Sequence, residues 1–205
     1  MRIGGFTVID PRVTEMTEYL RENLSKKRFY HSVCVAGAAK RLAEINGADP
    51  DKCYLAGLLH DICKELPKPE QLDMVLHSDF EVSDVEINAP KTHHAIAGAQ
   101  FVKGKYAITD PDILTPIRWH TVGKGSMNIY EQILYMADLI SDDRDYKDVE
   151  EIRDITYRDL NRGLYEAFKW MIQENLEKCR LIPQSTFDAY NEYTTIELTR
   201  LKDAE

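Results

Sequence analysis

The chain has 205 residues, a length that fits one domain and is sufficient for a substantial buried core. Its 35 acidic and 26 basic residues give a formal net charge of −9, which argues against a general surface for nucleic acid or anionic membranes. No apolar run reaches the roughly 18 residues of a membrane span, and the N-terminal stretch lacks the apolar core of a signal peptide. We therefore expect a cytoplasmic protein that holds any phosphate ligand through a few local cations or a metal.

The four cysteines are scattered along the chain and form no CxxC pair. They are Cys34, Cys53, Cys63 and Cys179. This spacing indicates neither a zinc knuckle nor a disulfide framework, so we expect reduced and mostly buried thiols.

Helix signals dominate the first third of the chain, and strand signals are nearly absent throughout. The first predicted helix follows Asp10-Pro11, a capping residue with a proline at the first helical position. Ser25 can cap a second helix, which should end at the glycine stop Asn46-Gly47. Asp49-Pro50 opens a third helix that we expect to end before Pro67. Because this third segment is apolar nearly all round, it is typical of a central helix.

The remainder of the chain continues the helical pattern, interrupted by a polar link over 77–91 and a glycine-bearing loop over 121–128. Pro116 lies inside one expected helix, where it predicts a kink or an early interruption. The other expected helices begin near Lys68, Thr92, Asp110 and Ile129, and extend over 149–176 with a break and over 186–201. The sequence therefore predicts an all-α fold.

Four of the six histidines and one aspartate lie among apolar residues of the predicted helices or at helix ends. They are His31, His60, His94, His120 and Asp138. A single histidine of this kind is more often a hydrogen-bonded core residue than a ligand. Five such positions on separate helices favour a metal site, because imidazole and carboxylate groups bind Zn, Fe, Mn and Co and a bundle core can gather them.

The stretch GLLHDICK places Asp61 directly after His60 within an apolar run. An unpaired buried carboxylate costs several kcal/mol, and a divalent cation would compensate its charge directly. Adjacent helical residues point about 100° apart, so the two side chains cannot both face one point head-on. Two arrangements remain: both residues lie at the edge of one site, or Asp61 bridges two ions while His60 binds one.

The order His31, His60-Asp61 and Asp138 resembles the H…HD…D signature of the HD-domain superfamily of metal-dependent phosphohydrolases. His94 and His120 match the longer pattern of its two-metal members. About residues 20 to 185 resemble the YqeK-type subfamily, in stretches that include RFYHSVCVAGAAKRLAEINGADPDKCYLAGLLHDICKELP, HHAIAGA, IRWHTVGKGSMNIYEQILYMADLIS and RDLNRGLYEAF.

The resemblance implies an all-α HD-domain helical bundle with a metal site in its core. It also implies a single domain over 1–205, in which C-terminal helices over 146–205 pack on a metal-binding core of about residues 20–145.

Enzymes of this subfamily are symmetrical diadenosine tetraphosphate hydrolases, which split the dinucleotide into two ADP. The resemblance implies that His31, His60, Asp61 and Asp138 bind one metal, and that Asp61, the central catalytic residue, bridges to a second metal bound by His94 and His120. Such ligands suit Fe, Mn, Co, Ni or Zn, and the subfamily resemblance favours two iron ions.

Three stretches depart from the subfamily pattern while leaving these ligands in place. H-G-P-V-G-A is replaced by His94–Ala99, T-T-G-R by Thr121–Lys124, and P-G-R by Asp142–Arg144. The departures affect residues that could choose the nucleotide.

A tetraphosphate carries more negative charge than two metal ions offset, so we expect cationic side chains at the site. Lys64, four residues beyond His60, is the first candidate for a catalytic phosphate clamp. Arg28, Lys124 and Arg144 are further candidates for substrate binding. Alternatively, each of these residues is an ordinary basic side chain in contact with solvent, and Lys64 lies at the solvated end of a helix.

Some neighbouring residues allow two interpretations. Tyr30, Trp119 and Tyr135 could stack on a base, but aromatic residues at helical spacing are more often part of a core. His93 points about 100° away from its neighbour in a helix, so we expect it beside the site rather than in it, and we expect His77 to be exposed.

The expected partner is therefore a small dinucleoside polyphosphate, with neither a nucleic acid polymer nor a membrane. One alternative is an HD-type nucleotidase or phosphodiesterase that acts on another nucleotide. Another is a non-catalytic helical protein that senses a nucleotide. The amphipathic segment at the C-terminal end, 186–205, is predicted either to pack on the body or to form a homodimer contact.

Overall fold

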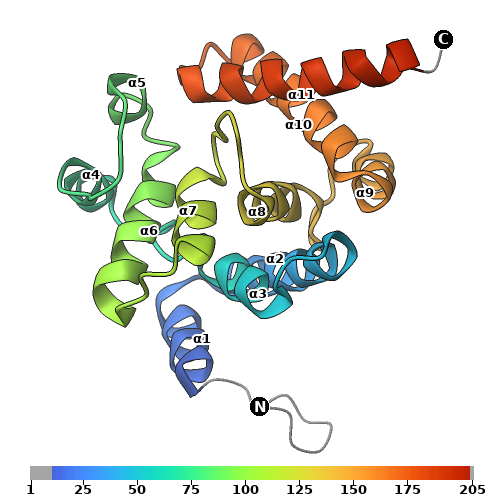
Figure 1. Ribbon diagram of the computed structural model, residues 1–205. Coiled ribbons are helices and arrows are strands. Elements are labelled where there is room, and N and C mark those ends of the chain that lie inside the picture. Colours follow the sequence, from blue (N-terminus) through green and yellow to red (C-terminus); the bar gives the residue numbers. More distant parts are fainter. Residues whose placement is uncertain (1–10, 204–205) are drawn as a thin grey trace, which may run out of the picture.

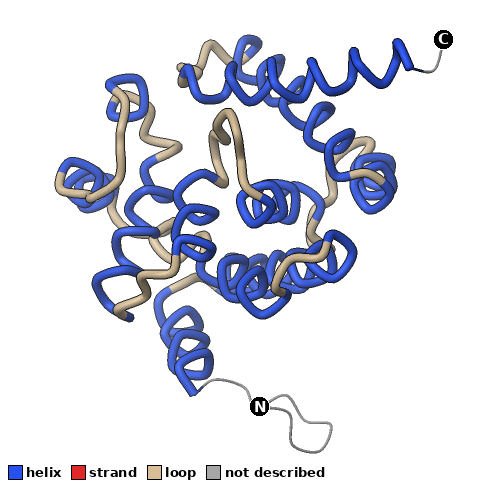
Figure 2. The backbone as a smooth tube through the Cα atoms, viewed as in Figure 1, coloured by secondary structure: helices blue, strands red, loops and turns tan. Residues whose placement is uncertain are grey.

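The computed structural model describes residues 11–203, and within this range the chain forms helices and no strand (Figure 2). The predicted all-α fold is confirmed. The helices are α1 (Pro11–Asn23), α2 (Lys26–Asn46), α3 (Pro50–Leu59), α4 (Lys68–Leu76), α5 (Asp84–Ile87), α6 (His93–Tyr106), α7 (Pro111–Trp119), α8 (Ile129–Ile140), α9 (Val149–Arg158), α10 (Leu160–Glu177) and α11 (Gln184–Asp203). The expected cap at Asp10 lies outside the described residues. Among the described helices, none is both long and apolar enough to cross a bilayer.

Helix α8 lies at the centre of the molecule, where it contacts α2, α3, α7, α9 and α10. Figure 1 shows α2 and α3 below it, α6 and α7 to its left, and α10 and α11 above it. Most of its apolar side chains are buried, including those of Ile133, Met136 and Ile140. Helix α3 is also packed from several sides, by α1, α2, α7 and α8, as its apolar sequence predicts.

Helices α2 and α3 approach each other closely because residue 57 is glycine. A Cβ atom at Gly57 would lie 2.8 Å from Cα of Ala36, too close for any larger side chain without backbone movement. Gly57 lies three residues before His60, and Ala36 lies five residues after His31. The close contact between α2 and α3 therefore lies only one to two helical turns along the chain from His31 and His60.

The predicted ends of the second helix are confirmed by local hydrogen bonds. The Ser25 hydroxyl accepts from the backbone N–H of Arg28 at 3.3 Å, which caps the start of α2. Gly47 adopts the left-handed conformation, with φ of 74°, and donates its N–H to the carbonyl of Ala43. Asp49 similarly caps α3 by accepting from the N–H groups of Asp51 and Lys52.

The third helix ends earlier than its sequence predicts, at Leu59 instead of shortly before Pro67. The Nδ1 atom of His60 lies 2.7 Å from the carbonyl of Gly57, the acceptor that the N–H of Asp61 would use if the helix continued. Residues 60–65 form turns, in which Lys64 donates its N–H to the carbonyl of Asp61 at 2.8 Å. His60 and Asp61 therefore lie at the end of a helix, and the helical spacing expected between His60 and Lys64 is wrong.

Two further segments differ from expectation. The polar link over 77–91 contains the short helix α5, which begins with a capping box formed by Ser83 and Glu86. Pro116 does not interrupt α7, which continues to Trp119. The expected break within 149–176 is confirmed at Asp159, which has extended backbone and caps α10 by accepting from the N–H of Arg162.

The C-terminal helix α11 packs on α10 (Figure 1). Tyr193 of α11 stacks on Phe168 of α10, with ring centroids 5.7 Å apart, and Phe168 stacks on Tyr135 of α8 at 4.5 Å. This aromatic column joins the C-terminal helices to the central one.

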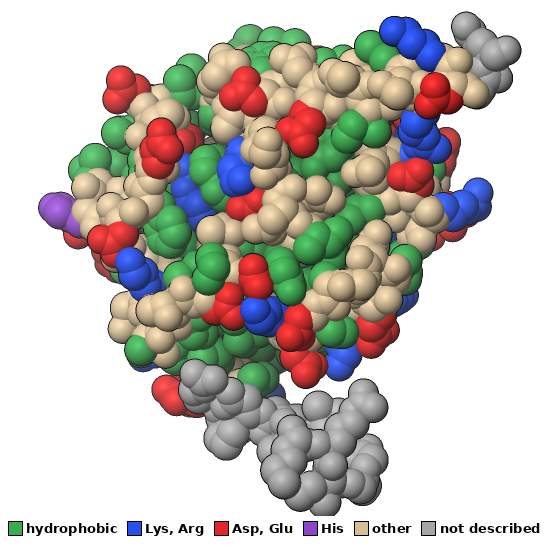
Figure 3. Space-filling view, in the orientation of Figure 1, with side chains coloured by type: hydrophobic (Ala, Val, Ile, Leu, Met, Phe, Trp, Pro, Cys, Tyr) green, Lys and Arg blue, Asp and Glu red, His purple; other side chains and the backbone are tan. Residues whose placement is uncertain are grey.

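The cysteines are all free, and only two of them meet the expectation of buried thiols. Cys53 and Cys63 are buried, whereas Cys34 is half-buried and Cys179 is exposed. On the face of the molecule shown in Figure 3, acidic and basic side chains are interspersed rather than gathered into one broad basic field.

Candidate metal centre

The structure brings all six predicted ligand residues into one cluster inside the bundle. His31 comes from α2 and Asp138 from α8, while the others lie at helix ends: His60 and Asp61 after α3, His94 in the first turn of α6, and His120 after α7. The four histidines and Asp61 are buried, and Asp138 is partly exposed. Five helices therefore contribute to a cluster whose members span more than 100 positions of the chain.

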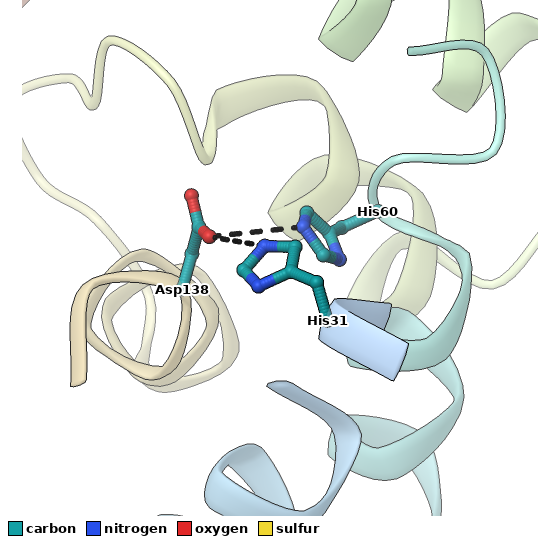
Figure 4. Close-up of side chains that lie close together, drawn as sticks. All are labelled: His31, His60 and Asp138. Carbon is teal, nitrogen blue, oxygen red and sulfur yellow. Dashed lines mark hydrogen bonds and ion pairs between the residues drawn. The ribbon is translucent and has the colours of Figure 1, made fainter. Parts of the chain in front are cut away.

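The first half of the cluster is formed by His31, His60 and Asp138, whose ligand atoms all lie within 4.8 Å of one another. Asp138 Oδ1 is 2.9 Å from Nε2 of His31 and 3.8 Å from Nε2 of His60. Figure 4 shows both imidazole rings turned toward this carboxylate from one side. Two imidazole nitrogens and a carboxylate oxygen thus converge on one point.

Asp61 lies between the two halves of the cluster. Its Oδ2 atom is 3.4 Å from Nε2 of His60 and 3.9 Å from Nε2 of His31. Its Oδ1 atom is 3.2 Å from Nε2 of His94 and 3.8 Å from Nε2 of His120. Because each carboxylate oxygen faces a different pair of histidines, the geometry suits a carboxylate that bridges two cations.

Two histidines have their tautomers set by the backbone. Nδ1 of His60 lies 2.7 Å from the carbonyl of Gly57, and Nδ1 of His120 lies 2.8 Å from the carbonyl of Ile117. A carbonyl only accepts, so both Nδ1 atoms carry a proton, which leaves Nε2 as the ring nitrogen available to a metal in the cluster. Metal-binding histidines in proteins are oriented in this way.

The donor set fits a divalent transition metal. Among the described residues, Nε2 of His60 and Oδ1 of Asp61 are buried without a hydrogen-bond partner. Nε2 of a neutral His60 and Oδ1 of an ionised Asp61 are both acceptors, so cations in the two halves of the cluster would satisfy lone pairs that are otherwise unpaired. Mixed imidazole and carboxylate ligands are those that first-row divalent metals prefer.

The protonation states also suit metal binding. Burial alone would raise the pKa of Asp61, but neighbouring imidazoles, His60 foremost, hold that pKa well below its usual range. Burial likewise opposes ionisation of Asp138, and the charge of Arg144 lowers the pKa of that carboxyl well below its ordinary value. Burial lowers the pKa of His94 to about 3, which leaves its ring neutral at pH 7. Ionised carboxylates and neutral imidazole are the forms that bind metal.

Three of the four predicted cationic residues lie against the cluster. Arg28 Nη1 is 2.6 Å from Oδ2 of Asp61, and Lys64 Nζ is 3.6 Å from Oδ1 of the same carboxylate. Arg144 forms an ion pair with Asp138 and also donates from Nε to the backbone carbonyl of Asp138 at 2.7 Å. The side chains of Arg28, Lys64 and Arg144 are 28%, 33% and 34% exposed, so each is open both to the cluster and to solvent.

Lys124 lies apart from these contacts, in the loop between α7 and α8. Its Nζ is 3.1 Å from a carboxylate oxygen of Glu131 and 3.3 Å from the carbonyl of Ser126. Glu131 is the buried acidic residue of the capping box that begins α8. Lys124 therefore offsets the charge of the carboxylate that caps the start of α8.

The other candidate residues have varied surroundings. Tyr135 is buried in the aromatic column, Trp119 packs under the guanidinium of Arg118 at 3.8 Å, and Tyr30 is exposed. Nε2 of His93 lies about as close to the carbonyl of Glu86 as to that of Ile87, at 3.1 and 3.0 Å, which ties α6 to α5. His77 is exposed, as its position in a polar stretch predicts.

Asp143 also lies against the cluster, a position that was not predicted from the sequence. Its Oδ2 atom lies 2.8 Å from Nδ1 of His31, on the side of the ring opposite the cluster. The only signal in the sequence is its place in the stretch Asp142–Arg144, five residues after Asp138, and acidic residues are too common at surfaces for that spacing to be informative.

Comparison with known proteins places this geometry in a family. The HD domain family matches residues 28–143, a range that includes all six predicted ligands. The symmetrical bis(5'-nucleosyl)-tetraphosphatase of Bacillus subtilis is 33% identical over 172 residues, which cover 84% of this chain and 92% of that protein. The protein of the same name from Staphylococcus aureus is 31% identical over 185 residues, covering 89% of this chain and 94% of its own length.

A solved structure has the same architecture. It is described as a predicted HD superfamily hydrolase involved in NAD metabolism, from Clostridium acetobutylicum. It superimposes with a TM-score of 0.85 at 34% sequence identity, covering 89% of this chain and 97% of that one. With its histidines and aspartates gathered at the helix ends and its sequence related over nearly the whole length, the chain belongs to the HD domain family.

Proposed function

We propose that this protein is a metal-dependent hydrolase that cleaves diadenosine tetraphosphate symmetrically into two ADP. The observation that carries the proposal is the position of Asp61, whose two carboxylate oxygens face two different pairs of histidines. Relatives of nearly the same length that are named symmetrical bis(5'-nucleosyl)-tetraphosphatases support the choice of substrate.

Six residues would hold two metal ions. His31, His60, Asp61 and Asp138 would bind the first, and Asp61 would bridge to a second bound by His94 and His120. When bound, such ions supply a water molecule of lowered pKa as the nucleophile and offset negative charge on the attacked phosphate. We propose iron for both positions, and Mn, Co, Ni and Zn are accepted by the same ligand types.

The cationic side chains would bind the polyphosphate. Arg28, Lys64 and Arg144 each contact a carboxylate of the cluster and are partly exposed, so their remaining N–H groups can reach phosphate oxygens. Attack of water on one of the two central phosphorus atoms would form a new P–O bond to that atom and break its bond to the oxygen that bridges it to the other central phosphorus, while the water loses a proton. ADP then leaves with the bridging oxygen, whose new negative charge these cations stabilise. Lys124 would contact a more distant part of the dinucleotide.

The test is product analysis with diadenosine tetraphosphate and purified protein, reconstituted separately with Fe, Mn, Co, Ni and Zn. We expect ADP as the sole nucleotide product, at two molecules for each substrate consumed. Release of AMP with ATP would contradict symmetrical cleavage. Hydrolysis of a mononucleotide without ADP release would instead identify an HD-type nucleotidase, and binding without turnover would identify a nucleotide sensor.

A further inference from the structure

The segment that follows α8 brings a second carboxylate to His31. Asp138 lies 2.9 Å from Nε2 of the ring, within the cluster, whereas Asp143 lies 2.8 Å from Nδ1, on the opposite side. The contact with Asp143 joins residues 112 positions apart in the chain. An ionised carboxylate only accepts hydrogen bonds, so when Nε2 binds a metal, Asp143 is the acceptor that keeps the remaining ring proton on Nδ1.

The carboxylate of Asp143 is itself held in place from the other side. The hydroxyl of Ser141, a completely buried residue, donates to Oδ1 of Asp143 at 2.7 Å, while Oδ2 faces His31. Arg153 of α9 donates to three backbone carbonyls of the same segment, those of Ile140 at 2.9 Å, Ser141 at 2.6 Å and Arg144 at 2.9 Å. The side chain of Arg153 is only 15% exposed. These contacts immobilise both the backbone of the segment and the acceptor that it presents to His31.

We propose that Asp143 is a positioning residue that fixes the tautomer and ring orientation of His31 for metal binding, with Ser141 and Arg153 as its supports. The inference rests on the proposed function, because it takes His31 as a metal ligand. His60 and His120 use neutral backbone carbonyls for the same purpose, so His31 differs from them in having a charged partner. A carboxylate partner makes the ligating imidazole more basic than a carbonyl does.

The stretch that carries Asp143 departs from the subfamily pattern that the rest of the sequence resembles. The subfamily pattern P-G-R corresponds here to Asp142–Arg144, so glycine stands in the pattern where this chain has Asp143. A glycine has no side chain to accept from His31. The positioning contact therefore follows from the structure of this protein and not from the resemblance.

The experiment measures Mn²⁺ affinity by titration calorimetry on full-length protein freed of metal by a chelator. Asp143→Ala removes the acceptor, and we expect Mn²⁺ affinity at the tighter site to fall about 10- to 100-fold. Asp143→Asn keeps an acceptor oxygen without the charge, so its loss should be smaller. The matched control is Asp142→Ala, which removes the same charge one residue earlier from a side chain that is 64% exposed and 3.5 Å from Arg41. We expect its affinity to equal that of the wild type.

A second readout reports the tautomer directly. Imidazole ¹⁵N NMR spectra of the Zn²⁺-loaded protein should show the His31 proton on Nδ1 in the wild type and in Asp143→Asn, and a mixture of ring states in Asp143→Ala. Circular dichroism checks that each variant is folded, and Asp143→Asn keeps the test decisive if Asp143→Ala does not fold. Wild-type Mn²⁺ affinity and an unchanged His31 spectrum in Asp143→Ala would overturn the inference alone, and if that variant does not fold, wild-type Mn²⁺ affinity in Asp143→Asn would do so. Absence of any Mn²⁺ binding by the wild type would instead refute the proposed function, and this inference with it.

Discussion

Asp61 is the residue on which both halves of the metal centre depend. It is buried, and its Oδ2 atom forms an ion pair with Nη1 of Arg28 at 2.6 Å. Its two carboxylate oxygens face four histidines. His31 lies on one side of the cluster and His94 on the other, whereas the two oxygens of Asp61 face both sides. Its loss should therefore differ in kind from the loss of any single histidine, because no other carboxylate among the described residues faces both pairs.

Replacing Asp61 by Asn should abolish binding of both ions and lower hydrolysis of diadenosine tetraphosphate by at least about 100-fold, since metal ions supply several kcal/mol of transition-state stabilisation. Metal content by mass spectrometry and initial rates of ADP release measure the two effects. Asp51→Asn is the control, because Asp51 is an exposed acid in the first turn of α3. Two ions per chain retained in Asp61→Asn would show that Asp61 does not bridge.

At the scale of elements, the packing of α2 on α3 determines where the metal centre forms. The close approach at Gly57 lies within two helical turns of His31 and His60, and α3 ends at Leu59, where Nδ1 of His60 bonds to the carbonyl of Gly57. A longer α3 would rotate Asp61 and Lys64 onto other faces of the helix. The early end of the helix thus turns Asp61 toward four imidazoles.

Gly57→Ala should destabilise the protein by about 1–3 kcal/mol, because the new methyl group would meet the backbone of Ala36 at 2.8 Å. Gly37→Ala is the matched control on the partner helix α2, where an added Cβ has no neighbour within 4 Å. It should stabilise by up to about 1 kcal/mol, because alanine favours a helix over glycine. Urea unfolding measures both free energies, and equal stability of Gly57→Ala and wild type would contradict the close-packing argument.

At the scale of the whole molecule, the cluster makes stability depend on pH. The pKa of His94 is about 3 in the folded protein, because of burial, compared with an ordinary value of 6.5. Below pH 6.5 the imidazole of His94 therefore binds a proton in the unfolded chain but not in the folded protein. The free energy of unfolding falls as the pH decreases from 6.5 towards 3. The lowered pKa of Asp61 has its effect at lower pH. The stability that it contributes is fully present above pH 3.8 and is lost as the pH falls and the folded-state carboxylate takes up a proton.

In the metal-free protein we expect the free energy of unfolding to decrease by several kcal/mol between pH 6.5 and 3, at about 1.4 kcal/mol per pH unit for one proton. His94→Gln should make this slope shallower, because the variant has no imidazole to protonate on unfolding. His77→Gln should leave the slope unchanged, since His77 is exposed. Denaturant titrations at a series of pH values measure the slope, and a His94→Gln slope equal to that of the wild type would refute the assignment.

Much of the fold could be predicted from the sequence because the signals act over a few residues. Ser25, Gly47 and Asp49 end or begin helices through hydrogen bonds to neighbours within five positions. The buried helices also follow from apolar spacing. The early end of α3 could not be predicted, because it depends on whether the side chain of His60 turns back to its own backbone or points elsewhere, and packing decides this.

The sequence by itself determined the all-α fold, the six residues that meet in the core, and three of the cations beside them, since their residue types and order carry that information. Only the tertiary structure decided that Lys124 lies on Glu131 and that Asp143 lies on His31. The contact between Asp143 and His31 joins two elements more than 100 residues apart, so it depends on how α2 packs against α8 and on how Arg153 holds the segment that follows α8. No local pattern in the chain encodes such a distance, because it results from the summed packing of several helices.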